Sequence, residues 1–308
     1  MSYILKLKPA LKDYLWGGTS LMQYFDTDSD KISEAWVLSC HKDGKSVIQN
    51  GELSGKTLNE AIDIWGKEQT LGSAASKFEF FPILIKLIDA KQNLSVQVHP
   101  DDEYAMRVEG EYGKTEMWYI LDAAQGAGIY YGFKNEISKE QLEEAIKTNT
   151  LTDLLRFVEV KKGECYFIPA GTVHAIGAGL TIAEVQQNSN TTYRVYDFGR
   201  VGADGKPREL HVEKAMEVST LAPASSAVTS SDEDVCTLAS CKYFNADKLS
   251  LSGEFELNSD GFYNLLIVDG EGEINGEKFT KYDSFFVPAD FGTVTLTGNA
   301  EIIISDVK

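Results

Sequence analysis

The chain has 308 residues, of which 43% are hydrophobic and 25% charged, and its formal net charge is -18. This length and composition are typical of a globular protein with about two domains. The negative charge disfavours nucleic acid and anionic membrane surfaces as partners, and any phosphate-bearing ligand would need a local cluster of lysines and arginines.

The N-terminal segment and the cysteines indicate a cytoplasmic protein. No apolar run approaches the ~18 residues of a membrane span, and "MSYILKLKPALKDYLWGG" lacks the apolar stretch of a signal peptide. The four cysteines, at positions 40, 165, 236 and 241, form no C-x-x-C pair and are interpreted as reduced core thiols. We expect a small-molecule ligand, no nucleic-acid or membrane partner, and a monomer or weak homodimer.

Short strand-like segments dominate the chain, and their Gly, Asn, Asp and Pro boundaries are typical of a β-sandwich or β-barrel. Strands are expected at 46–49, 83–88, 94–99, 117–121, 165–168, 181–185, 265–268 and 284–287. Helical spacing of apolar residues occurs at 57–65 and at 138–157, where Ser138 and Gln141 have capping-box spacing. After His99 a short helix is expected to run to Val108, with Asp101 as its N-cap.

An internal repeat divides the chain. "GECYFIPAGTVHAIG" at 163 aligns with "YDSFFVPADFGTVTL" at 282, and "EMWYILDAAQGAGI" at 116 aligns with "YNLLIVDGEGEING" at 263. Residues 221–234 are small, polar and finally acidic, which indicates a linker. We therefore predict two copies of an all-β unit. The first is a metal-binding domain over 1–225 with a helical insertion at about 134–157, and the second is a degenerate domain over 226–308.

The two copies differ at their polar positions. The alignment places Tyr263 opposite Glu116 and Thr293 opposite His174, so the second copy keeps the scaffold pattern without the side chains that could bind a ligand. Structural polar residues would have no reason to disappear together. We therefore expect the first copy to carry the active site and the second to serve as a scaffold.

Strand parity places polar side chains on inner faces of the first copy. In "LSVQVHP" the side chains of Ser95, Gln97 and His99 share one face, with ~7 Å between the last two. In "KTEMWYIL" Lys114 and Glu116 share a face with an aromatic residue. An acid on the inner face of an apolar strand is costly unless it is compensated, and a cation would compensate it.

The segment "GECYFIPAGTVH" has the pattern G-x5-P-x-G-x2-H, a tight turn that aims His174 inward. It resembles the second motif of the cupin superfamily. Combined with "LSVQVHPDD", "GKTEMWYIL" and "NSNTTYRVYDFGR", it resembles the type I mannose-6-phosphate isomerases (phosphomannose isomerases) in their short bacterial form. The resemblance covers most of residues 8–220. Ala178 replaces the usual asparagine and Ser33 a frequent glycine, and both positions are peripheral to the metal ligands.

The resemblance implies a mainly all-β fold of two cupin-type jelly-roll barrels. It also implies one Zn²⁺ per chain, held by Gln97, His99, Glu116 and His174. The expected reaction is the interconversion of mannose 6-phosphate and fructose 6-phosphate through an enediol. The types of donor atom support zinc independently of the resemblance, because two imidazoles, a carboxylate and an amide oxygen suit Zn²⁺. The same donors would also bind Mn, Fe or Co.

Four further residues are candidates for catalysis and substrate binding. Arg194 matches the family's catalytic arginine, and the alternative is an internal ion pair with Asp197. Lys114 is a candidate for the proton-carrying base or for phosphate binding. Lys86 interrupts an apolar run and either points into the site, as a substrate-binding residue, or reaches solvent. Ser95 is a candidate for hydrogen bonding to substrate.

The remaining histidines have simpler interpretations, and other functions stay open. His41 lies beside a turn and is expected at the surface, and His211 is expected to cap a helix. One competing function is an iron-dependent cupin dioxygenase, which would normally use more histidines. Others are a non-catalytic sugar-phosphate-binding cupin and an isomerase of another sugar. A purely structural module fits only the C-terminal copy.

Overall fold

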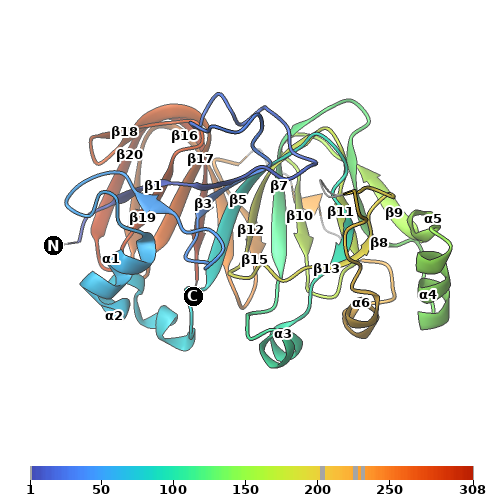
Figure 1. Cartoon of the computed structure of the whole chain (residues 1–308). Helices are drawn as coiled ribbons and strands as arrows, with labels where there is room; N and C mark the ends of the chain where they lie inside the picture. Colours follow the sequence, from blue (N-terminus) through green and yellow to red (C-terminus); the bar gives the residue numbers. More distant parts are fainter. Residues whose placement is uncertain (1, 202–204, 225–227, 230–232, 308) are drawn as a thin grey trace.

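The structure, a computed structural model, describes residues 2–201, 205–224, 228–229 and 233–307. Three antiparallel sheets form most of it. In Figure 1 the C-terminal strands lie at one end of the molecule, a five-stranded sheet lies towards the other end, and a seven-stranded sheet lies between them. The predicted all-β class is therefore confirmed.

The seven-stranded sheet has the order β14-β10-β7-β12-β5-β3-β2. Its strands are β2 (Ala10–Lys12), β3 (Glu34–Leu38), β5 (Ile83–Ala90), β7 (Glu116–Ala123), β10 (Cys165–Ile168), β12 (Leu180–Gln187) and β14 (Val228–Thr229). Strand β5 is buried along its whole length. Both of its faces are covered by protein, which explains why its sequence is a nearly continuous apolar run.

The five-stranded sheet has the order β13-β6-β11-β8-β9. Its strands are β6 (Val96–Val98), β8 (Gly128–Phe133), β9 (Leu155–Glu159), β11 (His174–Ile176) and β13 (Tyr193–Tyr196). It shares a hydrophobic core with the seven-stranded sheet, in which Trp118 and Ile182 pack with Ile129 and Ile176. Side chains on the facing surfaces of these two sheets therefore meet in one interior.

The eight-stranded sheet has the order β15-β16-β20-β17-β19-β1-β4, with β18 paired to β17. Its strands are β1 (Leu5–Lys8), β4 (Val47–Ile48), β15 (Val235–Ser240), β16 (Asn245–Ser259), β17 (Tyr263–Ile274), β18 (Glu277–Thr280), β19 (Ser284–Val287) and β20 (Gly292–Asp306). Two of them, β1 and β4, come from the first fifty residues of the chain. The position of a strand in the sequence therefore does not by itself tell which sheet it joins.

The helices are short and lie at the edges of the sheets (Figure 1). They are α1 (Leu58–Trp65), α2 (Lys67–Leu71), α3 (Asp102–Val108), α4 (Lys139–Lys147), α5 (Leu151–Leu154) and α6 (Val212–Val218), with a 3₁₀ turn at Ser73–Lys77. The predicted caps are present: Asp101 accepts from the Tyr104 N–H, and Ser138 and Gln141 form a capping box. In the described part of the chain, no helix has both the length and the apolar character of a membrane-crossing segment.

The helical stretch predicted over 138–157 is two short helices, α4 and α5, and the prediction is wrong from Leu155 onward, where a strand begins. Asn149 has a positive φ of 58° and ends the regular helix after α4. Residues 155–159 form β9, which pairs with β8 through Ile129 and Val158. A short apolar run can form either a strand or a helix. Here it forms a strand, because it pairs with β8 at the edge of the five-stranded sheet.

The strand pairing supports the internal repeat. Glu116 lies opposite Ile168 where β7 pairs with β10, and Tyr263 lies opposite Val287 where β17 pairs with β19. The aligned segments therefore begin at equivalent register positions in both copies. Within the predicted linker, 225–227 and 230–232 lie outside the described residues, and Val228–Thr229 pair with β10.

One hydrophobic core joins the two copies. Leu5 lies opposite Phe286 in the eight-stranded sheet. Both belong to a cluster that also contains Ile83 and Met117 of the seven-stranded sheet. The two copies therefore bury their apolar faces against each other.

Replacing Leu5 with alanine tests this shared core. Leu5 is fully buried, so Leu5→Ala is expected to lower the free energy of unfolding by about 2–5 kcal/mol. Lys8→Ala, at the exposed end of the same strand, is the control and is expected to cost less than about 0.5 kcal/mol. Urea denaturation measures both, and equal costs would show that β1 is not part of the core.

Candidate metal centre and adjoining cavity

Three buried side chains converge between the facing sheets. His99 follows β6, Glu116 begins β7 and His174 begins β11, and their ligand atoms all lie within 4.8 Å of one another. The structure contains the tight turn predicted before His174. Gly171 in this turn has a φ of +87°, and its N–H donates to the His99 carbonyl over 2.8 Å. The turn thus ties the two histidine segments together.

The contacts inside the cluster orient its donor atoms. His174 Nε2 lies 3.3 Å from Glu116 Oε1, and His99 Nε2 lies 3.7 Å from Glu116 Oε2. Each histidine uses its other ring nitrogen, Nδ1, against a backbone carbonyl: that of Thr191 at 2.9 Å for His99 and that of Thr172 at 2.8 Å for His174. A carbonyl only accepts, so the proton is on Nδ1 and the lone pair of each Nε2 faces the carboxylate.

Burial sets the charge state of the histidines. It lowers the pKa of His99 well below the usual value, with a further contribution from the Lys114 ammonium. It lowers the pKa of His174 to about 4. Both imidazoles are therefore neutral near pH 7, which is the form that binds a metal. Burial also raises the pKa of Glu116.

The cluster has the properties of a cation site. Among the described residues, His99 Nε2 and Glu116 Oε1 are buried without a hydrogen-bond partner. Such orphaned atoms are rare and costly in native proteins. A divalent cation would satisfy both atoms, and the N/O donor set fits Zn²⁺ or a similar transition metal.

Gln97 lies beside this cluster. It pairs with His174 in the register between β6 and β11, and its amide nitrogen lies 3.4 Å from His174 Nε2. A flip of the side-chain amide exchanges its oxygen and nitrogen and would present the oxygen at this place. Gln97 is therefore positioned to be a fourth donor.

A cavity of about 300 Å³ adjoins the cluster. Gln97 and Lys114 line it, and both also contact the cluster, since Lys114 Nζ lies 3.1 Å from Glu116 Oε2. The volume is at the lower end of the range for small-molecule pockets, ~300–1,000 Å³. The cavity therefore connects the candidate metal centre to a space for a small ligand.

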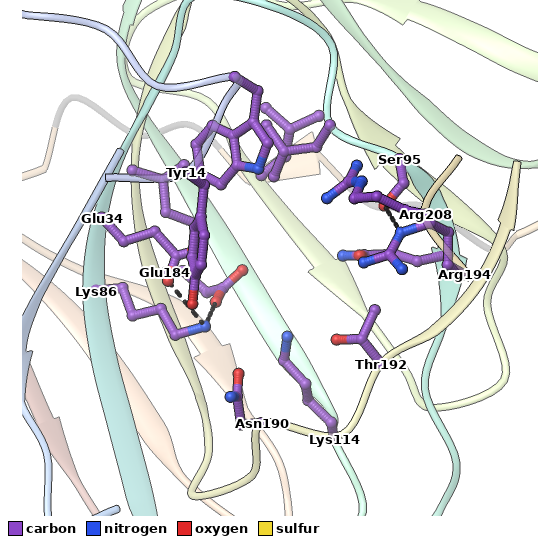
Figure 2. Close-up of a pocket in the computed structure, with 15 residues that line it drawn as sticks. Tyr14, Glu34, Lys86, Ser95, Lys114, Glu184, Asn190, Thr192, Arg194 and Arg208 are labelled. Atoms are coloured by element: carbon purple, nitrogen blue, oxygen red, sulfur yellow. Dashed lines mark hydrogen bonds and ion pairs between the residues drawn. The ribbon is translucent and has the colours of Figure 1, made fainter. Parts of the chain in front are cut away.

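One wall of the cavity carries arginines (Figure 2). The Nε–H of Arg194 donates to Ser95 Oγ over 3.2 Å and its Nη1 donates to the Glu209 carbonyl over 3.0 Å. Arg208 is held by Asp197, with its Nε 2.7 Å from Oδ2. Within the described residues Arg194 forms no salt bridge, so its charge is available to a ligand.

The opposite wall carries a lysine between two carboxylates (Figure 2). Lys86 Nζ lies 3.2 Å from Glu184 Oε1 and 3.8 Å from Glu34 Oε2. Burial lowers the pKa of Lys86, but the two carboxylates raise it by more. Burial raises the pKa of Glu184, but Lys86 and Lys114 lower it by more. Both groups therefore stay charged at neutral pH.

The structure brings all the residues predicted for the site to one place. The cluster contains His99, Glu116 and His174, and the cavity is lined by Lys86, Ser95, Gln97, Lys114 and Arg194. The two open alternatives are decided as well. Lys86 is buried against the cavity rather than in solvent, and Asp197 bonds to Arg200 and Arg208 rather than to Arg194.

The interpretations of the other two histidines are wrong. His41 is buried, not at the surface, because its ring lies between Asp43 and Glu111. His211 occupies the N-cap position of α6, but its side chain makes no capping bond. Its Nδ1 accepts from the Arg194 backbone N–H instead.

Sequence reasoning missed several residues of the cavity. They are Tyr14, Trp16, Glu34, Glu184, Asn190 and Arg208. Two of them carried a usable signal: Glu34 and Glu184 are acids within buried strands, the same pattern that singled out Glu116. Their carboxylates accept from the indole N–H groups of Trp36 at 2.6 Å and Trp118 at 2.8 Å.

Comparison with known proteins gives the family. The model of the phosphomannose isomerase type I catalytic domain matches residues 4–125, and that of the mannose-6-phosphate isomerase cupin domain matches residues 234–307. Mannose-6-phosphate isomerase ManA of Bacillus subtilis is 42% identical over 98% of both chains. The Streptococcus mutans mannose-6-phosphate isomerase is 37% identical over 99% of this chain and 98% of its own.

The fold agrees with these relatives. The crystal structure of the mannose 6-phosphate isomerase from Bacillus subtilis superposes with a TM-score of 0.89 at 35% identity, covering 99% of this chain and all of that one. Both the sequence and the fold thus agree with one family. The chain belongs to the type I phosphomannose isomerases, a family of aldose-ketose isomerases.

Proposed function

We propose that this protein is a zinc-dependent isomerase that interconverts mannose 6-phosphate and fructose 6-phosphate through an enediol. One observation carries the proposal: a buried His/Glu/His cluster opens, through Gln97 and Lys114, onto a cavity with an arginine wall. The names of the relatives support the choice of substrate. Because the protein as a whole carries a net charge of -18, a phosphate group can be bound only where cationic side chains are clustered, as on the arginine wall of the cavity.

The proposed zinc ligands are Gln97, His99, Glu116 and His174, with one ion per chain. The orphaned donor atoms in this cluster support the assignment. When bound, the ion would act as a Lewis acid on the oxygens at C1 and C2 of the open-chain sugar. The carbonyls of Thr191 and Thr172 keep both imidazoles in the tautomer that this requires.

We propose that the substrate lies with its phosphate towards Arg208 and Ser95. A guanidinium matches the geometry of a phosphate better than an ammonium does. The opposite wall contains Glu34 and Glu184, which would repel a phosphate. Lys86 lies between these two carboxylates, so it is better suited to hydrogen bonding with sugar hydroxyls.

We propose that Arg194 and Lys114 act on the reacting carbons. Isomerisation moves a proton between C2 and C1 while negative charge builds on the carbonyl oxygen. Arg194 carries a fixed positive charge without a carboxylate partner among the described residues, and it would stabilise that charge. Lys114 lines the cavity between the two walls (Figure 2), and its amine, once it has released a proton, is the proposed carrier of the proton between C2 and C1.

We propose that the chain divides near residue 225 and that its second unit serves as a scaffold. The positions aligned with Glu116 and His174 hold Tyr263 and Thr293, and the Thr293 hydroxyl donates to Asn258 Oδ1 over 2.8 Å. Among the described residues, one group of His, Cys, Asp and Glu side chains is close enough together to hold a metal ion, and it is the His99–Glu116–His174 cluster. The second unit would then support the first through the shared core.

The reaction itself is tested by a coupled assay of mannose 6-phosphate conversion. The untreated protein is expected to form fructose 6-phosphate, a chelator is expected to abolish the activity, and added Zn²⁺ is expected to restore it. Other aldose phosphates, assayed in parallel, would reveal an isomerase of another sugar. Full activity in protein shown by elemental analysis to be metal-free would contradict the proposal.

Glu116→Gln tests the metal site with a nearly isosteric change. Zinc affinity is expected to fall by at least about 100-fold, because even partners outside the coordination sphere are worth about 10–100-fold. Glu301→Gln is the matched control, since Glu301 is bonded to Tyr119 and is not part of the cluster. Competition with a chromophoric chelator measures both affinities. Unchanged zinc binding in Glu116→Gln would exclude this carboxylate as a ligand.

Arg194→Ala separates catalysis from metal binding. The variant is expected to keep its zinc and to lose more than tenfold in kcat, which corresponds to more than about 1.4 kcal/mol of barrier. Arg107→Ala, which removes an exposed arginine of α3, is the control and should retain normal turnover. A kcat within tenfold of the original would show that Arg194 has no catalytic role.

A further inference from the structure

The loop 188–192, which joins β12 to β13, contributes to the site on two sides. Its Thr191 carbonyl accepts the Nδ1–H of His99 over 2.9 Å. Two of its residues, Asn190 and Thr192, line the cavity (Figure 2). A displacement of this loop would therefore change both the orientation of a proposed metal ligand and the shape of the cavity wall.

Glu111, which is not among the residues that line the cavity, is bonded to this loop. Its Oε2 accepts from the Asn190 backbone N–H at 3.4 Å and from the Thr191 hydroxyl at 3.3 Å. Its Oε1 lies 2.6 Å from Lys42 Nζ and 3.5 Å from His41 Nε2. The carboxylate thus connects the loop to the 41–44 turn, which is distant in the sequence.

The charge on Glu111 makes it a strong acceptor. Burial raises its pKa, but the bond from Lys42 and the proximity of His41 lower it by more, so the group is ionised at neutral pH. Hydrogen bonds to a charged acceptor are roughly twice as strong as neutral ones. His41 is oriented for its contact, because its Nδ1 accepts from the Asp43 N–H over 3.1 Å and leaves the Nε2–H for Glu111.

The other anchors of the loop act on different residues. Gln186 donates to the carbonyls of Gln187 and Ser189, both over 2.7 Å. Asp43 accepts from the half-buried side chain of Asn190 over 2.9 Å. Within the described residues, the bonds to Thr191 from outside the loop come from His99 and Glu111. Glu111 is thus two contacts away from His99, a proposed ligand of the metal.

We infer that Glu111 is a positioning residue for the metal centre: through Thr191 it fixes His99 in the orientation that binds metal. The inference rests on the proposed metal site, although not on the identity of the sugar. Residues that orient the ligands of a metal typically contribute about 10–100-fold to its affinity. Glu111 is one contact further out, so we expect a value near the lower limit.

The test compares two variants that break the same ion pair. Glu111→Ala removes the bond to Lys42 and the bonds to the loop, and it is expected to raise the zinc dissociation constant about tenfold. Lys42→Ala removes only the ion pair of an exposed side chain and is expected to change the constant less than about twofold. Glu111→Gln keeps an acceptor for the loop and should restore most of the affinity.

A second pair of measurements identifies the path. Thr191→Val removes the hydroxyl that bonds to Glu111 and leaves the carbonyl that accepts from His99. It is expected to weaken zinc binding about threefold, and its effect should not add to that of Glu111→Ala, as is usual for residues in one network. In the metal-free protein, ¹⁵N chemical shifts of the His99 ring should show a weakened Nδ1–H bond in Glu111→Ala.

The results separate this inference from the proposed function. Zinc affinities are measured by chelator competition, so they apply even if the protein proves to isomerise another sugar. Wild-type affinity in Glu111→Ala would overturn the inference and leave the isomerase assignment intact. Equal losses in Glu111→Ala and Lys42→Ala would also overturn it, because the ion pair rather than the loop would then matter. If Glu111→Ala fails to fold, Thr191→Val decides the question, because wild-type zinc affinity in that variant would overturn the inference.

Discussion

The burial of the Glu116 carboxylate between two sheets is the constraint on which the rest of the site depends. Around it, Glu34 and Glu184 are also buried, while Lys86 and Lys114 are the buried cations. Three carboxylates against two ammonium groups leave one negative charge in excess, and the two neighbouring imidazoles are held neutral by their own burial. A site with this imbalance is stable only if a cation enters or if Glu116 takes up a proton, which explains why its pKa is raised.

The C-terminal sheet has a comparable strand pairing without this charge. In the eight-stranded sheet the equivalent of Glu116 is Tyr263, which lies opposite Val287 as Glu116 lies opposite Ile168. The interior of that sheet is closed by apolar residues such as Leu265. This pairing is thus compatible with either a buried acid or a tyrosine at this position. Burial of the polar groups in the cluster costs folding free energy. Apolar packing around the cluster, including the core shared by the seven-stranded and eight-stranded sheets, offsets this cost.

Much of the cavity could be predicted because strand parity and buried polarity are local signals. Gln97 and His99 alternate with valines, and a lysine inside a buried strand, Lys86, is informative by itself. What could not be predicted depends on pairing between distant segments. β1 joins the C-terminal sheet because Leu5 packs against Phe286, and no local pattern indicates that partner. A position beside a turn predicts a surface location for His41, but Asp43 and Glu111 satisfy its ring in the interior.

The metal site and the cavity wall are held in place by different kinds of contact. The ligand segments at His99 and His174 are joined by the bond from Gly171 to the His99 carbonyl, which depends on a left-handed glycine. The cavity wall, by contrast, is built on the loop 188–192, whose position is fixed by side chains of other loops. The order of these contacts is physically sensible. The bond from Gly171 holds the backbone at His99, while Glu111, through the loop 188–192, is inferred to orient the His99 ring and supports the part of the cavity wall formed by Asn190 and Thr192.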